Sequence, residues 1–61
     1  MNRLKARREE LNLTQKQVAD RIGIAQQIYQ RYESGKVIPI AYTAVKVAKA
    51  LETTVENLFD S

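Results

Sequence analysis

The sequence predicts an all-α fold in which five short helices surround one small core. Glycine and proline occur only at Gly23, Gly35 and Pro39, so long stretches can stay helical. No segment alternates apolar and polar residues over the length of a strand, and no hairpin dipeptide such as Asn-Gly is present. Apolar residues instead recur at helical spacing behind residues that commonly cap helices. We therefore expect a single compact domain over residues 1–61.

The first two helices have recognisable start and stop signals. Asn2 can cap a first helix, and Asn12 can end it in the left-handed conformation. Thr14 and Gln17 have the spacing of a capping box, which predicts a second helix over residues 15–22.

The third helix is expected to follow almost at once. Gly23 ends the second helix, the third runs from about Gln26 to Ser34, and Gly35 is a natural residue to follow it. Because two short helices joined by so short a turn cannot lie antiparallel, we expect them to cross steeply. Apolar spacing predicts a fourth helix from about Ala41 to Leu51.

A last helical turn over residues 55–59 is expected, with Thr54 as its cap. The predicted core residues share helical spacing and apolar character, and they are Val18, Ala19, Ile22, Ile24, Tyr32, Ala44, Val45, Ala48 and Leu51.

Composition narrows the classes of function. The 61 residues include neither cysteine nor histidine, which removes disulfides, thiolate chemistry, a histidine base and an ordinary zinc site. We therefore expect no metal and no cofactor. The sequence contains no evident nucleophile paired with a base, so we do not expect an enzyme. No apolar run approaches the length of a membrane span or a signal-peptide core, so we expect a cytoplasmic protein.

The charge is positive and unevenly distributed. The net charge is +3; residues 1–36 hold eight of the ten Lys and Arg residues but only four of the seven Asp and Glu residues. Such a basic half is typical of a surface for a polyanion. A small basic excess also occurs in proteins that use it only for solubility, so charge alone does not decide the function.

The polar residues of the predicted third helix are unusual for a solvated surface, which more often carries Glu and Lys. If the two tyrosines of this helix face the core, Gln26 and Gln30 stack on the outer surface, and Gln27 and Arg31 stack beside them. Gln can bond adenine and Arg can bond guanine in a DNA major groove. The alternative is that Gln is an ordinary surface helix former. Groups suited to phosphate at both ends of the motif, Thr14, Gln15, Lys16 and Lys36, favour the DNA interpretation.

Residues 15–36 resemble the helix-turn-helix of the phage repressor and Cro family, also called the Xre family. The resemblance covers nearly the whole chain. It includes Leu13-Thr14-Gln15, Ala19, Gly23, Glu33-Ser34-Gly35, Pro39, Ala48-Lys49-Ala50-Leu51 and Leu58-Phe59. It implies a five-helix repressor-type DNA-binding domain whose second and third helices form the motif, with the third in the major groove.

The resemblance also implies roles for particular residues. It implies base contacts from Gln26, Gln27 and Arg31, with Ile28 near a thymine methyl, and position adds Gln30 to this set. The candidates for DNA phosphate contact are Thr14, Gln15, Lys16, Lys36, Arg8 and Tyr42. For Tyr42, a subunit contact or half-burial are alternatives.

One structural ion pair is predicted from the family and the residue types together. Arg8 on the first helix and Glu33 at the end of the third are expected to form a partly buried pair that leaves guanidinium donors for a phosphate. The alternative is two solvated charges, which usually contribute little to stability. Ala25 departs from the family, because Ser or Thr usually caps the third helix there. Tyr29 departs as well, because the family usually has a smaller Ile or Val at this position. We therefore expect its ring to reach the edge of the core, where its hydroxyl needs a partner or water.

Self-association is expected from the same resemblance. Val55, Leu58 and Phe59 either cover the core or present an apolar patch to a second copy. We expect a weak homodimer that binds double-stranded DNA at a two-fold operator, as a repressor or controller of transcription. The alternative is an antitoxin or protein-interaction module of the same fold, whose apolar C-terminal turn binds a protein partner such as a toxin.

Overall fold

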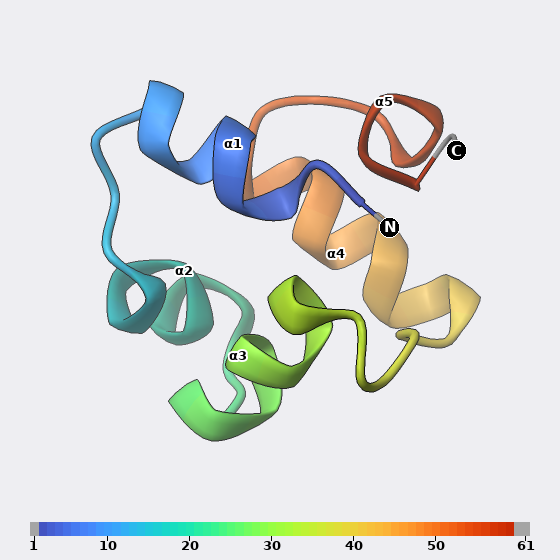
Figure 1. Cartoon of the computed structure of the whole chain (residues 1–61), viewed down its shortest axis with the longest axis horizontal. Coiled ribbons are helices and arrows are strands. Elements are labelled where there is room, and N and C mark those ends of the chain that lie inside the picture. Colours follow the sequence, from blue (N-terminus) through green and yellow to red (C-terminus); the bar gives the residue numbers. More distant parts are fainter. Residues whose placement is uncertain (1, 60–61) are drawn as a thin grey trace.

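The computed structural model describes residues 2–59, which form five α-helices and no strand. The predicted all-α fold is confirmed (Figure 1). The helices are α1 (Leu4–Glu10), α2 (Gln15–Ile22), α3 (Gln26–Ser34), α4 (Ala41–Ala50) and α5 (Val55–Phe59).

The predicted capping groups are present at the starts of α2 and α5. The Thr14 hydroxyl accepts from the Gln17 backbone N–H at 3.1 Å, and the Gln17 side-chain oxygen accepts from the Thr14 N–H at 2.8 Å. The Thr54 hydroxyl accepts from the Asn57 N–H at 3.1 Å. These bonds satisfy N–H groups that have no partner within the helix, so each helix begins where its cap lies.

Left-handed residues end several of the helices. Gly23 and Gly35 follow α2 and α3 with φ of 74° and 80°, and Asn12 follows α1 with φ of 59°. A Cβ at either glycine would meet no heavy atom within 4 Å, so backbone conformation and not space favours glycine there. Glu52 also has a positive φ of 56° after α4, which the sequence did not indicate.

The core forms where α2 packs on α3 and α4, α1 packs on α3, and α4 packs on α5. Figure 1 shows α2 and α3 as a pair joined by a short turn, with α1, α4 and α5 above them. The buried apolar residues are Leu4, Val18, Ala19, Ile22, Tyr29, Tyr32, Ala44, Val47, Ala48, Leu51 and Leu58.

The predicted core is wrong at one position of α4. Val45 is 44% exposed, whereas Val47 is fully buried. Apolar residues surround most of α4, so two overlapping stripes fit helical spacing. The stripe that contains Ala44, Val47, Ala48 and Leu51 is the one that α2 and α5 cover.

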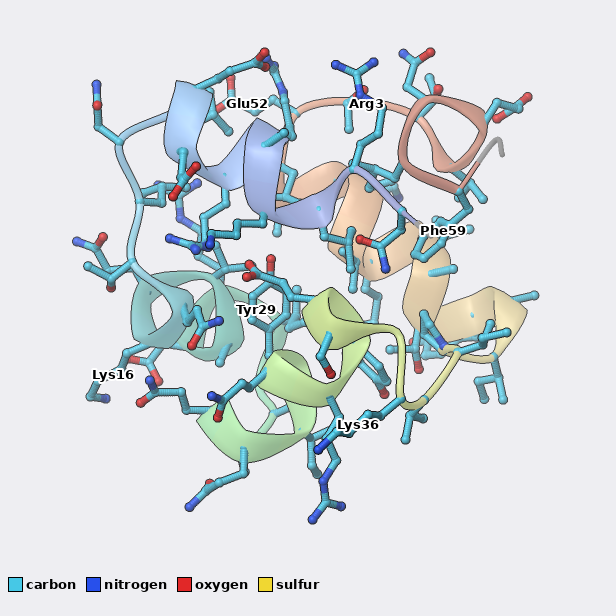
Figure 2. All side chains as sticks on the ribbon, viewed as in Figure 1. Arg3, Lys16, Tyr29, Lys36, Glu52 and Phe59 are labelled. Carbon is cyan, nitrogen blue, oxygen red and sulfur yellow. The ribbon has the colours of Figure 1, made fainter. Side chains whose placement is uncertain are left out.

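The expected position of Tyr29 at the edge of the core is also wrong. Its side chain is fully buried, and its hydroxyl makes no hydrogen bond that satisfies the usual geometry. Figure 2 shows the ring directed from α3 toward α1. The ring therefore fills the centre of the domain, at the cost of an unpaired buried hydroxyl.

Val47→Ala should lower the free energy of unfolding by about 1.5–3 kcal/mol, because it removes fully buried methyl groups and leaves a cavity. Val45→Ala is the matched control, and it should change stability by no more than about 0.5 kcal/mol because this side chain is largely exposed. Urea denaturation of both variants measures the difference. Equal destabilisation would contradict this assignment of the α4 faces.

Candidate nucleic-acid interface

The outer face of α3 carries the predicted amide and guanidinium side chains. Gln26, Gln27, Gln30 and Arg31 are all exposed, whereas the two tyrosines of α3 are buried. Ile28 lies at the border of this face and is 42% exposed. The burial of the tyrosines thus turns the amides and the guanidinium of the helix toward solvent.

A shallow hollow of about 300 Å³ lies on this face. Its lining residues are Gln27, Gln30, Arg31, Ser34 and Lys36. Sequence reasoning did not select Ser34, although it lies four residues after Gln30 and so occupies the same side of the helix. Its hydroxyl donates to the Arg31 carbonyl at 3.1 Å. We call the exposed residues Gln26, Gln27, Ile28, Gln30, Arg31 and Ser34 the α3 surface.

Cationic and polar groups lie at both ends of the helix-turn-helix. Lys36 follows α3 and is exposed, and its side chain lines the same hollow as Gln27 and Arg31. Thr14 and Lys16 are exposed at the start of α2. Lys16 Nζ lies 3.1 Å from Asp20 Oδ2, but an exposed i,i+4 pair of this kind contributes only about 0.3–0.5 kcal/mol and yields readily to another anion.

The predicted ion pair between Arg8 and Glu33 is confirmed. Arg8 Nε and Nη2 donate to the two Glu33 carboxylate oxygens at 2.6 and 3.3 Å, and Gln15 Nε2 adds a third bond at 3.0 Å. The Arg8 and Glu33 side chains are only 12% and 5% exposed. We call these three residues the Glu33 clamp, because it joins α1 and α2 to the last turn of α3.

In the Glu33 clamp, burial and hydrogen bonds shift the pKa of the Glu33 carboxylate in opposite directions. Burial by itself would raise the pKa of Glu33, but the bonds from Arg8 and Gln15 outweigh it, and the pKa lies below its ordinary value of 4.5. Burial raises the pKa of the Tyr29 hydroxyl, and the nearby Glu33 carboxylate raises it further. The hydroxyl therefore interacts electrostatically with this carboxylate, although the two groups do not have the geometry of a hydrogen bond.

The phosphate contact of Arg8 stays a prediction. Its third nitrogen, Nη1, donates to the Leu13 carbonyl at 2.8 Å, so three of the five guanidinium N–H groups are bonded within the fold. Gln15 is partly committed too, since its amide N–H belongs to the Glu33 clamp. Sequence reasoning did not indicate the bond from Arg8 to the Leu13 carbonyl, five residues away, or the bond from Gln15 to Glu33, 18 residues away.

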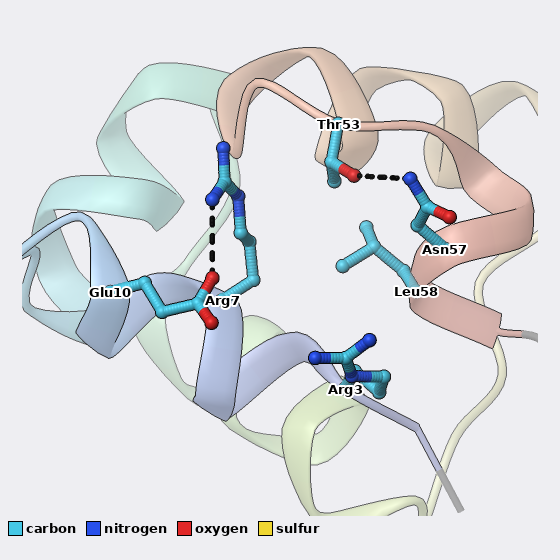
Figure 3. A pocket seen from close by; sticks show the side chains of 6 residues that line it. All are labelled: Arg3, Arg7, Glu10, Thr53, Asn57 and Leu58. Atoms are coloured by element: carbon cyan, nitrogen blue, oxygen red, sulfur yellow. Dashed lines mark hydrogen bonds and ion pairs between the residues drawn. The ribbon is translucent and has the colours of Figure 1, made fainter.

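Arg7 occupies a second structural position on the other side of α1. Its guanidinium donates to the carbonyl oxygens of Leu51 at 2.9 Å and Glu52 at 3.1 Å, and it pairs with Glu10 at 3.1 Å. It therefore ties α1 to the end of α4. Figure 3 shows Arg7 and Glu10 at a hollow of about 250 Å³ between α1 and α5. The residues that line it are Arg3, Arg7, Glu10, Thr53, Asn57 and Leu58.

The residues suggested for a dimer contact divide into two groups. Leu58 is 1% exposed and belongs to the core, so the suggestion that it contacts a second copy is wrong. Val55 and Phe59 are half-buried and pack against the same core. Tyr42, by contrast, is 74% exposed, with Lys46 Nζ 5.7 Å from the centre of its ring.

The described residues contain no group of three or more potential metal ligands among Cys, Asp and Glu side chains. None of the helices within residues 2–59 is long and apolar enough to cross a membrane.

This arrangement of five helices, with a short turn between α2 and an exposed α3, defines a helix-turn-helix domain. Residues 4–58 match the helix-turn-helix family, and the chain belongs to that family.

The chain is similar to transcriptional regulators of bacteriophage and archaeal origin. It is 45% identical over 56 residues to the cryptic phage CTXphi transcriptional repressor RstR of Vibrio cholerae, an alignment that covers 92% of this chain and 50% of RstR. It is 36% identical over 58 residues to the uncharacterized HTH-type transcriptional regulator MJ0272 of Methanocaldococcus jannaschii, covering 95% and 88% of the two chains. An uncharacterized HTH-type regulator of Archaeoglobus fulgidus is 32% identical over 57 residues, covering 93% and 80%. The chain thus spans about half the length of RstR.

Glu33→Gln should make the stability of the domain less dependent on pH. Because the folded-state pKa of Glu33 lies below 4.5, its charge stabilises the fold fully above that value, and this contribution is lost as the pH falls through the folded-state pKa. The wild type should therefore be more stable than Glu33→Gln at pH 7, and the difference should shrink in acid.

Urea denaturation between pH 7 and acid pH measures this difference. Glu56→Gln, on the exposed side of α5, is the control and should follow the wild type. A wild type and a Glu33→Gln variant that differ by the same free energy at every pH would contradict the role assigned to this carboxylate.

Proposed function

We propose that this chain is a sequence-specific regulator of transcription that binds double-stranded DNA and reads the major groove with α3. The observation that carries this proposal is the composition of the α3 surface, on which three amides and a guanidinium are exposed together. Similarity to a phage repressor supports a repressor or controller in particular. A cytoplasmic location agrees with this role and stays a prediction.

The α3 surface has the donors and acceptors that base edges require. A Gln side chain can bond adenine N6 and N7, and Arg can bond guanine O6 and N7. Arg31 has an exposed guanidinium, and Gln27 and Gln30 line the hollow beside it. Ile28 is exposed enough to meet a thymine methyl group. These four side chains and Gln26 are the proposed base contacts.

Contacts to the DNA backbone position the reading helix. Lys36 lies at one end of α3, and Thr14, Lys16 and the Gln15 backbone lie at the start of α2. The free N–H groups and positive dipole of a helix start favour a phosphate. Tyr42 can add a hydroxyl donor from α4. Phosphate contacts on both sides of α3 would set its register against the bases.

We propose further that two copies occupy a two-fold operator. A single domain of this size contacts one half-site, and two half-sites one helical turn apart lie about 34–36 Å from centre to centre. Pairing two copies multiplies the discrimination that one short helix can provide. We expect a mixture of monomer and dimer in solution and a dimer on DNA.

Selection of bound sites from random DNA tests the proposal, and Arg31→Ala sharpens the test. The wild type should enrich a two-fold sequence, and Arg31→Ala should relax the preference at one base pair per half-site, at a cost of about 1–3 kcal/mol. Gln26→Ala and Gln27→Ala should relax neighbouring positions.

Arg3→Ala is the matched control for Arg31→Ala. It removes the same charge from an exposed site, and Figure 2 places Arg3 at the opposite end of the molecule from Lys36. Its selected sequence should equal that of the wild type. If the α3 variants select the same sequence as the wild type, the bases are not read by α3.

Lys36→Ala should weaken binding to all DNA sequences alike. Loss of one phosphate contact should reduce the slope of log affinity against log salt concentration by about one unit for each bound chain. Fluorescence anisotropy at several salt concentrations measures this slope. Lys5→Ala on exposed α1 is the control and should leave the slope unchanged. A Lys36→Ala slope equal to the wild-type slope would remove Lys36 from the interface.

A further inference from the structure

A further hollow of about 340 Å³ lies between α2 and α4, separate from the α3 surface. Its lining residues are Arg21, Ile22, Lys46, Lys49 and Ala50, and we call them the basic hollow. The first two end α2, and the other three lie in the second half of α4. All three charged residues of this lining are cations, and no acidic side chain is among them.

The floor of the basic hollow is apolar. Ile22 is 4% exposed and belongs to the core, so only the edge of its side chain reaches the hollow. Ala50 contributes a half-buried methyl group that packs against the same core. The three long side chains around this floor are exposed, and each has an aliphatic stem that ends in a charged group. The hollow thus combines a small apolar floor with a cationic rim.

The positive charge of this rim is only partly compensated within the fold. Arg21 Nη1 donates to the Ala50 carbonyl at 3.2 Å, at the end of α4. The dipole of a helix places only about half a negative charge at this end, whereas three cations gather here. Lys46 Nζ lies 5.7 Å from the centre of the Tyr42 ring, which is uncharged. Within residues 2–59, none of the three cations forms an ion pair with a carboxylate.

The two helices that form the basic hollow offer no counter-ion of their own. The helix α4 contains no Asp or Glu, and the one acidic residue of α2, Asp20, pairs with Lys16. Lys46 and Lys49 are three residues apart and therefore share one side of α4, and Arg21 faces them from α2. The arrangement is complementary to carboxylates that lie on both sides of an apolar side chain.

The basic hollow is also distinct from the proposed DNA contacts. It shares no residue with the α3 surface or with the proposed phosphate contacts. Gln15 begins α2 at the proposed phosphate-binding end, and Arg21 lies about 9 Å further along the helix axis. A phosphate backbone has no apolar group for the floor, whereas a protein segment can carry carboxylates and an apolar side chain together. These features favour a protein as the occupant.

We propose that the basic hollow binds an acidic segment of a partner protein, in which carboxylates flank an apolar side chain. The apolar side chain contacts Ile22 and Ala50. The carboxylates pair with Lys46 and Lys49 on one side and with Arg21 on the other. Because ion pairs on an open surface are weak and are screened by salt, this contact is transient. The segment can bind while α3 occupies DNA, a point that rests on the proposed function.

A synthetic peptide that repeats Glu-Leu-Glu is the probe for this site, and the amide NMR spectrum of the isotope-labelled protein locates its binding. The shifts should saturate and should be largest at the basic hollow. A peptide with Gln in place of Glu should not bind, because it lacks the charge that the rim requires. A peptide with Ser in place of Leu should bind more weakly, because it leaves the apolar floor uncovered.

The double variant Lys46→Ala and Lys49→Ala should weaken binding of the Glu-Leu-Glu peptide by about tenfold, because it removes two of the three cations. Both side chains are exposed, so the fold should persist, as thermal unfolding can verify. Arg21 is left in place because it bonds to the end of α4. Arg3→Ala with Lys5→Ala removes the same charge from exposed positions at α1 and should bind like the wild type.

Several outcomes overturn this inference. They are equal binding by the lysine variant and the wild type, shifts that cluster on the α3 surface, and the absence of saturable binding of the Glu-Leu-Glu peptide. Duplex DNA that shifts the amides of the basic hollow also overturns it, because the hollow then belongs to the DNA-binding surface.

Failure of the proposed function is a different result. It appears as a lack of sequence preference in the selection of DNA sites, and it leaves peptide binding to the free protein unchanged. Loss of peptide binding, in turn, leaves the selected DNA sequence unchanged.

Discussion

The nearly buried carboxylate of Glu33 holds three helices in one arrangement, and the direction of α3 depends on it. A charge so far from solvent is costly unless donors surround it, and here Arg8 from α1 and Gln15 from α2 supply them. A fourth bond acts nearby, since Asn2 donates to the Tyr32 carbonyl at 2.8 Å. Because Glu33 lies in the last turn of α3, these bonds determine which side of α3 faces the protein and which side faces solvent.

The apolar side of α3 completes this constraint. A nine-residue helix is not stable by itself, so α3 depends on the burial of Tyr29 and Tyr32 against its neighbours. Ala25 provides no side-chain cap at its start, which increases this dependence. The unpaired Tyr29 hydroxyl adds a further cost. The α3 surface is therefore presented by tertiary packing on a helix with little stability of its own.

Three surfaces of this small domain differ in polarity and charge. The α3 surface is polar and is bordered by Lys36. The exposed side chains of the loop between α3 and α4 and of the start of α4 are uncharged and mostly apolar, and the far side of α1 carries Arg3 and Arg7 with acidic and polar neighbours. A domain this small has little surface area for each task. The proposed base recognition by one copy and the proposed pairing of two copies on DNA would together produce specificity that neither provides alone.

The residues themselves determined the local features of this protein: the capping box at Thr14, the left-handed ends at Asn12, Gly23 and Gly35, and the side-by-side amides of α3. These depend on neighbours within one helical turn, and the sequence contains those neighbours. The family resemblance added the ion pair of Arg8 and Glu33, which the structure confirms. Packing alone decided that Val47 and not Val45 enters the core, that Leu58 is buried, and that Arg8 Nη1 donates to the Leu13 carbonyl. Such outcomes depend on which of two apolar stripes, or which of several donors, meets a partner from a distant part of the chain.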